Sequence, residues 1–355
     1  MTAKKVLPGF RAGKWGLLAG IVFLFSFCTS DSPKTIDATD RMDTYNVVWD
    51  SPSKDASGVM PLGNGDIAAG VYAIEDGDLY LLLAKNDAYN FAGDILKTGR
   101  VRISLNPNPF KKGEPFRQTL DLKTGSIRIE AGGVSVLVWA DAHHPVYHVE
   151  VESDEAISVT AAPGFWERFL TSSWNNFDAA QEVSQIDNSV TPPQDVLLER
   201  NGNLLWYYTV GEQSVFSEDM IYYDVEELIG KYPDPYLYNT FGNLLESPDL
   251  ELKNSQLEGN GKNFTIRIHA LTQKAPDVDQ WIEAIEEQAS QSTDRSEAWD
   301  AHCQWWSDFW NRSWIFVSSN DIPEEEREIL NSEGYLPKRQ EKDGGALVAQ
   351  SYNVF

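Results

Sequence analysis

A glycine-rich turn near the start of this chain carries two short hydrogen-bonding side chains. In the segment Met60–Val71, two glycines flank an asparagine after Pro61, and glycine permits the positive φ that a tight turn requires. The turn is therefore predicted to project the amide of Asn64 and the carboxylate of Asp66. The same pattern is also typical of a hairpin loop with no further role, and the apolar residues after it predict a strand.

Two adjacent histidines, His143 and His144, also suggest chemistry, because imidazole is a common metal ligand. Neighbouring residues of a strand point to opposite faces, so the pair cannot readily chelate one ion. We expect a structural role for both histidines and assign no metal and no cofactor. The chain has 54 Asp and Glu residues, but no motif singles out any of them, so no catalytic residue is assigned.

The composition limits both the class of protein and its ligands. With 355 residues and 42% hydrophobic content, the chain can bury a substantial core in one large domain or two modest ones. A formal net charge of −25 and a pI near 4.5 argue against nucleic-acid binding, which requires clustered Lys and Arg. Neutral ligands such as sugars are compatible with this charge, which by itself indicates a soluble, self-repelling surface.

Residues 1–28 predict an export signal. Basic residues precede an apolar run, Trp15–Phe27, that is too short for a comfortable membrane span. Cys28 follows directly and resembles the acylated cysteine of a bacterial lipoprotein, with residues 29–43 as a tether. Phe27 stands where such signals usually have Gly, Ala or Ser, so a plain secretory signal or an uncleaved anchor remains an alternative. We expect either a membrane-anchored lipoprotein, in the periplasm or at the cell surface, or a secreted protein.

Strand patterns dominate residues 44–275. Apolar and polar residues alternate at 101–105 and 264–270, which predicts strands with one buried face. Continuous apolar runs at 79–83 and 134–139 predict strands that are covered on both faces. Gly, Asn, Asp and Pro separate these segments. The chain is therefore predicted to be mainly β, an antiparallel β-sandwich.

Two helices are predicted to follow the sandwich as a linker over residues 276–318. Asp277 and Asp294 have the spacing of helix caps, each with a Gln or Glu three residues later. The first helix has one apolar stripe, and the second has an aromatic stripe from Trp299 to Trp310. Such a stripe fits either a sugar-stacking platform or packing against a neighbouring domain, and its helical spacing favours packing.

Three further segments do not follow the sandwich pattern. Residues 171–195 are polar and predict a long loop over one sheet. Residues 319–345 form a highly charged connector. Residues 346–355 predict the beginning of a helix that has no partner to pack against, which indicates an interrupted helical domain.

Several short motifs occur in the order and spacing of one known family. They are Trp49–Pro52, Met60–Gly65, Lys85–Ala88, Gly99–Arg102, Phe116–Asp121, Asp141–Pro145, Asp234–Pro235, Thr240–Gly242 and the helix around Trp305–Trp314. Together they resemble the N-terminal β domain of bacterial six-hairpin glycosidases related to glycoside hydrolase family 95, the α-L-fucosidase group. The resemblance spans residues 45–355.

This resemblance implies a β supersandwich, a helical linker and then an (α/α)6 barrel that holds the catalytic carboxylates. Val348–Tyr352 resemble the opening helix of that barrel, so the catalytic groups are expected beyond residue 355 and little activity is expected from this chain alone.

Loops of such a β domain can lean over the mouth of the barrel. On that basis Asn64, Asp66, Asn86 and Asp87 are candidates for binding sugar hydroxyls, and Trp139 is a candidate stacking surface. For each Asn or Asp the alternative is an Asx-turn that bonds its own backbone.

The sequence departs from the family pattern at two places. Tyr208, Thr209 and Val210 stand where relatives tend to have His, Arg and Asn, and Asn239 stands where an Arg is common. If those groups normally face substrate, the site here has changed or decayed. Three hypotheses follow: a component of an exported glycoside hydrolase that acts on glycans with a separate barrel, a non-enzymatic carbohydrate-binding or structural surface module, and a decayed product without function.

Overall fold

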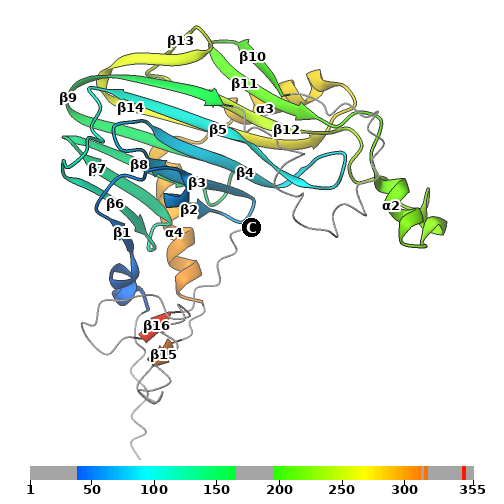
Figure 1. Cartoon of the computed structure of the whole chain (residues 1–355), viewed down its shortest axis with the longest axis horizontal. Coiled ribbons are helices and arrows are strands. Elements are labelled where there is room, and N and C mark those ends of the chain that lie inside the picture. Colours follow the sequence, from blue (N-terminus) through cyan, green and yellow to red (C-terminus); the bar gives the residue numbers. More distant parts are fainter. Residues whose placement is uncertain (1–37, 165–194, 313–315, 319–345, 349–355) are drawn as a thin grey trace, which may run out of the picture. The chain divides into compact units, whose positions relative to one another are not determined.

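The computed structural model describes residues 38–164, 195–312, 316–318 and 346–348 (Figure 1). The predicted export signal, Cys28, nearly all of the predicted loop 171–195 and the charged connector 319–345 lie outside the described residues. Within the part of the chain that the structure describes, no helix is long and apolar enough to cross a membrane.

The described chain is built around one antiparallel sheet of fourteen strands, so the predicted mainly β fold is confirmed. The strands are β1 (Val47–Trp49), β2 (Met60–Gly63), β3 (Ile67–Ala73), β4 (Leu79–Tyr89), β5 (Ile95–Asn106), β6 (Phe116–Asp121), β7 (Ser126–Ala131), β8 (Val134–Ala140), β9 (Val146–Gly164), β10 (Val196–Arg200), β11 (Asn203–Thr209), β12 (Asn239–Glu246), β13 (Glu251–Lys253) and β14 (Gln256–Lys274).

Two 19-residue strands, β9 and β14, produce the layers of the sandwich. One edge of β9 pairs with β14 along most of its length. Its other edge pairs first with β8 and further along with β5. The sheet therefore forks, and the branch from β5 through β4 and β3 to β2 packs against β7, β8, β12 and β14. The main hydrophobic core fills the space between these layers.

The predicted apolar runs occupy the centre of this core. Every second residue of β4 from Leu79 to Leu83 is fully buried, and β8 is buried along nearly its whole length. The Met60–Val71 segment forms the hairpin of β2 and β3, with the predicted turn between them. Ala38–Tyr45 form a 3-10 helix whose Met42 lies in the core. The fold therefore includes residues from Ala38 onward that were predicted to belong to the tether, residues 29–43.

The two predicted linker helices are present as α3 (Val278–Ser290) and α4 (Arg295–Trp310), and Asp277 and Asp294 cap them as expected. Both helices pack against the sandwich. The stripe of α3 joins a second core cluster with residues of β11 and β12. Trp306, Phe309 and Trp310 of α4 pack against the main core, and Trp310 donates a hydrogen bond to the Leu122 carbonyl.

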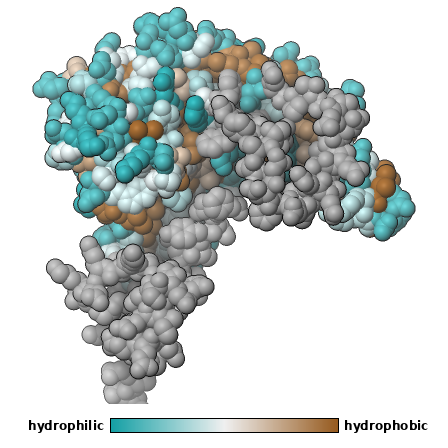
Figure 2. All heavy atoms as spheres, in the orientation of Figure 1, coloured by the Kyte–Doolittle hydropathy of each residue, from teal (hydrophilic) through white to brown (hydrophobic). Residues whose placement is uncertain are grey.

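A small lobe with exposed aromatic residues interrupts the sheet between β11 and β12. It contains α2 (Phe216–Tyr222) and η3 (Glu226–Leu228), and Figure 2 shows a hydrophobic spot on its surface. Its exposed apolar and aromatic side chains are Ile221, Tyr222, Tyr223, Ile229 and Tyr232. This group is called the tyrosine lobe below.

The predicted start of a helix at residue 346 is wrong for the residues that the structure describes there. Ala346–Val348 form a short strand, β16, that pairs with β15 (Phe316–Ser318). The helical linker predicted over residues 276–318 likewise ends in a strand, β15, and not in a helix. In both segments, antiparallel pairing satisfies backbone groups of the strands.

Close packing around Trp206 makes one glycine indispensable. The Trp206 indole is fully buried and donates a hydrogen bond to the Thr98 carbonyl at 2.8 Å. Gly242 of β12 lies opposite this part of β11. A Cβ atom on Gly242 would lie 2.1 Å from the backbone oxygen of Trp206.

We predict that Gly242→Ala lowers the free energy of unfolding by about 3 kcal/mol or more, because backbone atoms of a central strand pair cannot move aside. Gly211→Ala is the matched control, since a Cβ there meets no atom within 4 Å, and its effect is expected to stay within about 0.5 kcal/mol. Urea unfolding followed by circular dichroism measures both variants. Equal losses would contradict the packing argument.

Candidate functional site

Asp66, Lys85 and Asp87 form a cluster beside the turn between β2 and β3, called the carboxylate rim below. The Lys85 ammonium lies 2.8 Å from Asp66 Oδ1 and 2.9 Å from Asp87 Oδ1. The lysine side chain is only 7% exposed, whereas the two aspartates are 42% and 47% exposed. The rim therefore presents two accessible carboxylates that are held on one buried cation.

The position of Lys85 follows from the alternation of β4. Leu79, Leu81 and Leu83 point into the core, and Lys85 is the next residue on the same face. Its aliphatic stem continues the buried row while its ammonium extends to the end of the strand. A buried ammonium requires a charged partner, and the carboxylates of Asp66 and Asp87 supply that charge.

The turn that carries Asp66 is fixed by Asn64. Its Oδ1 accepts hydrogen bonds from the backbone N–H groups of Asp66 and Ile67, at 2.9 and 2.8 Å. Its Nδ2 donates to the carbonyl oxygens of Asp141 and His144, at 2.6 and 3.4 Å. The Asx-turn that was the alternative for Asn64 is therefore present, and the same side chain joins this turn to the connection between β8 and β9.

The four polar residues predicted to bind sugar hydroxyls lie in one place. Asp66 and Asp87 meet through Lys85, while Asn86 donates from Nδ2 to the Gly65 carbonyl at 3.1 Å. In this arrangement Asn64 and Asn86 position the turn, and the two aspartates present the free hydrogen-bonding capacity. Sugar binding by these residues remains a prediction.

The residues that depart from the family pattern serve packing here. Tyr208 and Val210 are buried with Phe241 in a small cluster. The Asn239 amide donates to the carbonyl oxygens of Asp87 and Tyr89, at 3.3 and 3.0 Å. Asn239 thus ties β12 to the end of β4 beneath the rim.

The prediction that Trp139 offers a stacking surface requires correction. Its side chain is fully buried, with its ring stacked on His148 at a centroid distance of 3.8 Å. Trp299 of α4 packs on it edge-on at 5.2 Å, and Trp139 Nε1 donates a hydrogen bond to Glu150. Because α4 covers this part of β8, no ring face of Trp139 is available to a sugar.

A neutral histidine fastens α4 to the sandwich. His302 Nδ1 accepts a hydrogen bond from the Ala142 backbone N–H at 3.2 Å, so its Nε2 carries the proton and donates to the Thr124 carbonyl at 2.6 Å. Burial lowers the pKa of His302 to about 4, against an opposing effect of the Thr124 hydrogen bond. The ring is therefore a fully paired, uncharged link between the helix and two loops.

His143 and His144 lie in the bend between β8 and β9 rather than in a strand, so the argument from opposite strand faces does not apply to them. Asp141 holds this bend, because its Oδ1 accepts from the backbone N–H groups of His143 and His144 at 2.8 and 3.2 Å. Among the described residues, no group of three His, Cys, Asp or Glu side chains has the geometry of a metal site.

The Asp141 carboxylate is ionised although it is buried. Burial opposes its charge, but the His148 imidazole and the backbone donors of the bend outweigh this effect and hold the pKa of Asp141 at about 2. His148 Nε2 lies 3.9 Å from Asp141 Oδ2, beyond hydrogen-bond distance. The backbone N–H groups of His143 and His144, together with the His144 ring 3.3 Å from Asp141 Oδ2, therefore stabilise the charge directly.

Three residues shape this region although no individual role was predicted for them: Lys85 and Asp141, which occur in the family motifs, and His302. For Lys85 a signal existed, because a lysine in phase with three buried leucines of one strand predicts a buried charge with an acidic partner nearby. Asp141 precedes two histidines in a turn, a position typical of an Asx-turn. The partners of His302 are 160 and 178 residues away in sequence, so no local pattern could identify them.

Comparison with known families gives one match over most of the chain. The profile described as "Domain of unknown function (DUF5703)", an N-terminal domain, matches residues 48–315. No curated protein matches.

Among solved structures, one match is a protein named as a kojibiose phosphorylase, from the human microbiome, with 10% sequence identity and a TM-score of 0.40. The match covers 78% of this chain and 39% of that chain, so this chain spans about two fifths of the length of that protein. Neither comparison names glycoside hydrolase family 95, and that finer resemblance remains a proposal.

We predict that Lys85→Met lowers the free energy of unfolding by roughly 1–3 kcal/mol, because the two carboxylates lose their shared counter-charge while methionine retains most of the buried stem. Their exposure lets solvent absorb part of this loss. Adding Asp87→Asn to Lys85→Met is expected to cost less than the sum of the single changes, which a double-mutant cycle measures. Lys111→Met, at an exposed position, is the control, and a loss equal to that of Lys85→Met would contradict the pairing.

We predict that the protein becomes less stable as the pH falls from about 6.5 towards 4. An unfolded histidine takes up a proton below about 6.5, whereas folded His302 resists protonation down to about 4. The unfolded state therefore binds more protons in this window, and stability decreases with decreasing pH by roughly 3 kcal/mol for this residue. Burial lowers the pKa of His148 in the same direction.

The measurement is urea unfolding of the wild type and of His302→Gln between pH 7.5 and 4.5. Glutamine has an amide that can donate to the Thr124 carbonyl but does not titrate, so the variant is expected to have a shallower dependence of stability on pH. Equal slopes for the two proteins would show that His302 does not contribute.

Proposed function

The chain belongs to the family described as a domain of unknown function, DUF5703, and we propose a role for it on this premise. In this proposal the chain is the non-catalytic N-terminal β part of an exported, α-L-fucosidase-like glycoside hydrolase that acts on glycans. The order of the sequence motifs supports this proposal, since they resemble the β domain of six-hairpin glycosidases. The (α/α)6 barrel implied by that resemblance would be the partner domain that carries out catalysis.

The observation that carries the proposal is the carboxylate rim. Sugar hydroxyl groups are recognised by a few polar groups held in fixed positions. Asp66 and Asp87 are accessible acceptors, and the shared ammonium of Lys85 fixes both. The Asn64 turn and the Asn239 bridge to β4 hold the backbone on either side. This rigidity suits a surface that contributes hydrogen bonds to a glycan.

The rim is not proposed as a catalytic pair. Glycoside hydrolysis requires an acid on one side of the scissile bond and a base or nucleophile on the other. Asp66 and Asp87 instead converge on one ammonium. The proposal therefore assigns binding to this chain and hydrolysis to the partner domain.

Export is the second part of the proposal. Residues 1–28 would direct the chain out of the cytoplasm, and acylation of Cys28 would anchor it to a membrane, in the periplasm or at the cell surface. The acidic composition, with a net charge of −25, is compatible with neutral glycan ligands and supports no role with nucleic acids.

A surface carbohydrate-binding module without hydrolase activity is the alternative, and the tyrosine lobe favours it. Tyr222, Tyr223 and Tyr232 are 56%, 63% and 62% exposed. Exposed aromatic rings bury apolar sugar faces while their hydroxyl groups remain solvated. The two candidates therefore predict binding at different places on the chain.

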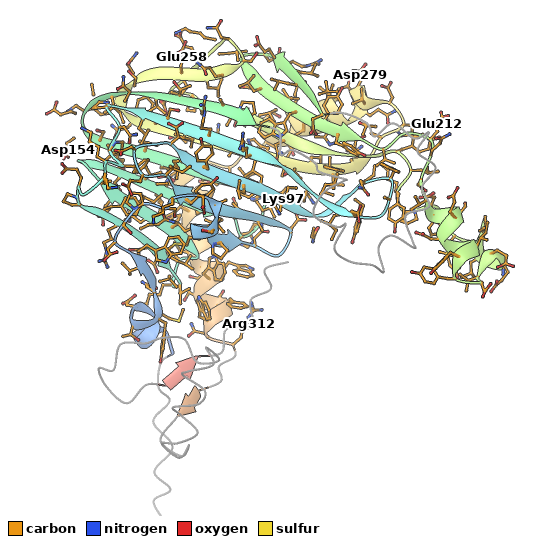
Figure 3. The ribbon with its side chains drawn as sticks, viewed as in Figure 1. Lys97, Asp154, Glu212, Glu258, Asp279 and Arg312 are labelled. Atoms are coloured by element: carbon orange, nitrogen blue, oxygen red, sulfur yellow. The ribbon has the colours of Figure 1, made fainter. Side chains whose placement is uncertain are left out.

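We predict that the full chain binds fucose-terminated oligosaccharides in a calorimetric titration and releases no product from aryl fucosides. The Asp66→Asn, Asp87→Asn double variant is expected to bind about tenfold more weakly, because it replaces both charged acceptors. Asp154→Asn is the control, because Asp154 is exposed and distant from the rim. In Figure 3 the position of the rim is marked by Lys97, which pairs with Ala84 next to Lys85, and Asp154 lies far from it.

Substitution of the three exposed tyrosines by alanine separates the alternatives. Loss of binding in this variant, with unchanged binding in the rim variant, would support the binding module. Hydrolysis that depends on a carboxylate of this chain would refute the assignment of catalysis to a partner domain.

A further inference from the structure

A cavity of about 440 Å³ lies where α3 and α4 meet the connection between β8 and β9. It is called the junction cavity below, and it is distinct from the carboxylate rim. The sheet side contributes Asp141 and His148, and the helical side contributes Gln288 and Ser292. Its volume is in the range of small-molecule sites.

The junction cavity contains a buried histidine whose ring nitrogens have no hydrogen-bond partner, and the Asp141 carboxylate lies 3.9 Å from Nε2. His148 is 5% exposed, and neither Nδ1 nor Nε2 makes a hydrogen bond. Stacking on Trp139 at 3.8 Å and 5° fixes the ring plane. Burial lowers the pKa of His148, so the neutral ring offers one donor and one acceptor.

A second orphaned group lies on the helical side. Ser292, in the connection between α3 and α4, has a buried hydroxyl without a partner. Buried polar groups are almost always paired, and each unpaired group costs about 1–3 kcal/mol. Two such groups in one polar cavity therefore point to a ligand that pairs with both.

The charges of the lining restrict the kind of ligand. Asp141 is ionised, because the backbone donors of its bend stabilise the charge and hold its pKa low, and Glu287 is an exposed residue of the cavity lining. These carboxylates repel anions and accept hydrogen bonds from hydroxyl groups. A hydroxyl both donates and accepts, so it also matches the neutral His148 ring and Ser292.

We propose that the junction cavity binds a neutral polyhydroxy molecule of monosaccharide size, with hydroxyl groups paired to His148, Ser292 and Asp141. The inference is independent of the proposed function, because it rests on the lining of this cavity and not on the rim or on a catalytic partner. A metal ion fits less well, because the described residues provide no set of three suitable ligands.

The chain has five histidines, all within the described residues. The NMR spectrum of histidine-labelled protein therefore contains few ring signals, and the signal of His148 can be followed separately. Titration of the full chain with D-glucose or L-fucose, up to roughly 50 mM, is expected to shift the His148 ring signal saturably. D-Glucuronate, which adds a carboxylate, is expected to bind about tenfold more weakly.

His148→Phe retains the stacked ring but removes both nitrogens, and it is expected to weaken sugar binding about tenfold. Ser292→Ala tests the same cavity from a half-buried position, where loss of the hydroxyl leaves the core intact. Thermal unfolding verifies that both variants fold. The Asp66→Asn, Asp87→Asn rim variant is expected to retain this binding, which separates the junction cavity from the proposed function.

Three results would overturn the proposal. The first is the absence of a saturable shift with either sugar. The second is unchanged binding in both cavity variants. The third is a wild-type protein that binds no sugar but binds Zn²⁺ tightly, with the Zn²⁺ binding lost in His148→Phe. That result would identify a cation site instead.

Discussion

The antiparallel pairing of β9 with β14 is the interaction on which both layers depend. These strands share hydrogen bonds on both sides of a bulge near Gly261. On the other edge of β9, β8 and β5 leave in two branches. This one ladder therefore sets the position of the β2–β5 branch, which carries the rim, and of β8, which supports the junction cavity. A displacement of β9 would alter both sites, whereas each branch can vary at its free end.

The helix α4 completes the cavity side of the sandwich through polar contacts rather than apolar area alone. Arg295 donates from Nε to Glu150 Oε1 at 2.8 Å and pairs with the other oxygen through a second nitrogen. His302 and Trp310 bond the carbonyl oxygens of Thr124 and Leu122. Hydrogen bonds require a defined geometry, so these contacts fix the register of the helix. That register places α4 over Trp139 and closes the junction cavity.

Local pattern predicted the strands at 79–83, 101–105, 134–139 and 264–270 and both helix caps, because alternation and capping depend on neighbouring residues. Two of the sequence predictions for Trp139 were incompatible with each other. The run at 134–139 predicts a strand covered on both faces, which is incompatible with an exposed stacking surface. Contacts across 145 to 178 residues, such as those of Arg295 and His302, depend on how the layers pack. The fork at β9 was unpredictable for the same reason, since alternation gives the faces of a strand but not its partners.

The identity of residue 64 follows from its position between the two sites. Its amide uses two donors, toward the Asp141 and His144 carbonyls, and two acceptor positions, toward the N–H groups of Asp66 and Ile67. Only a carboxamide of this length satisfies all four. Aspartate would preserve the turn but would place an anionic oxygen against two carbonyl oxygens and next to the buried Asp141 carboxylate. An asparagine is therefore required where the rim turn and the Asp141 bend meet, and the two sites share one rigid connection.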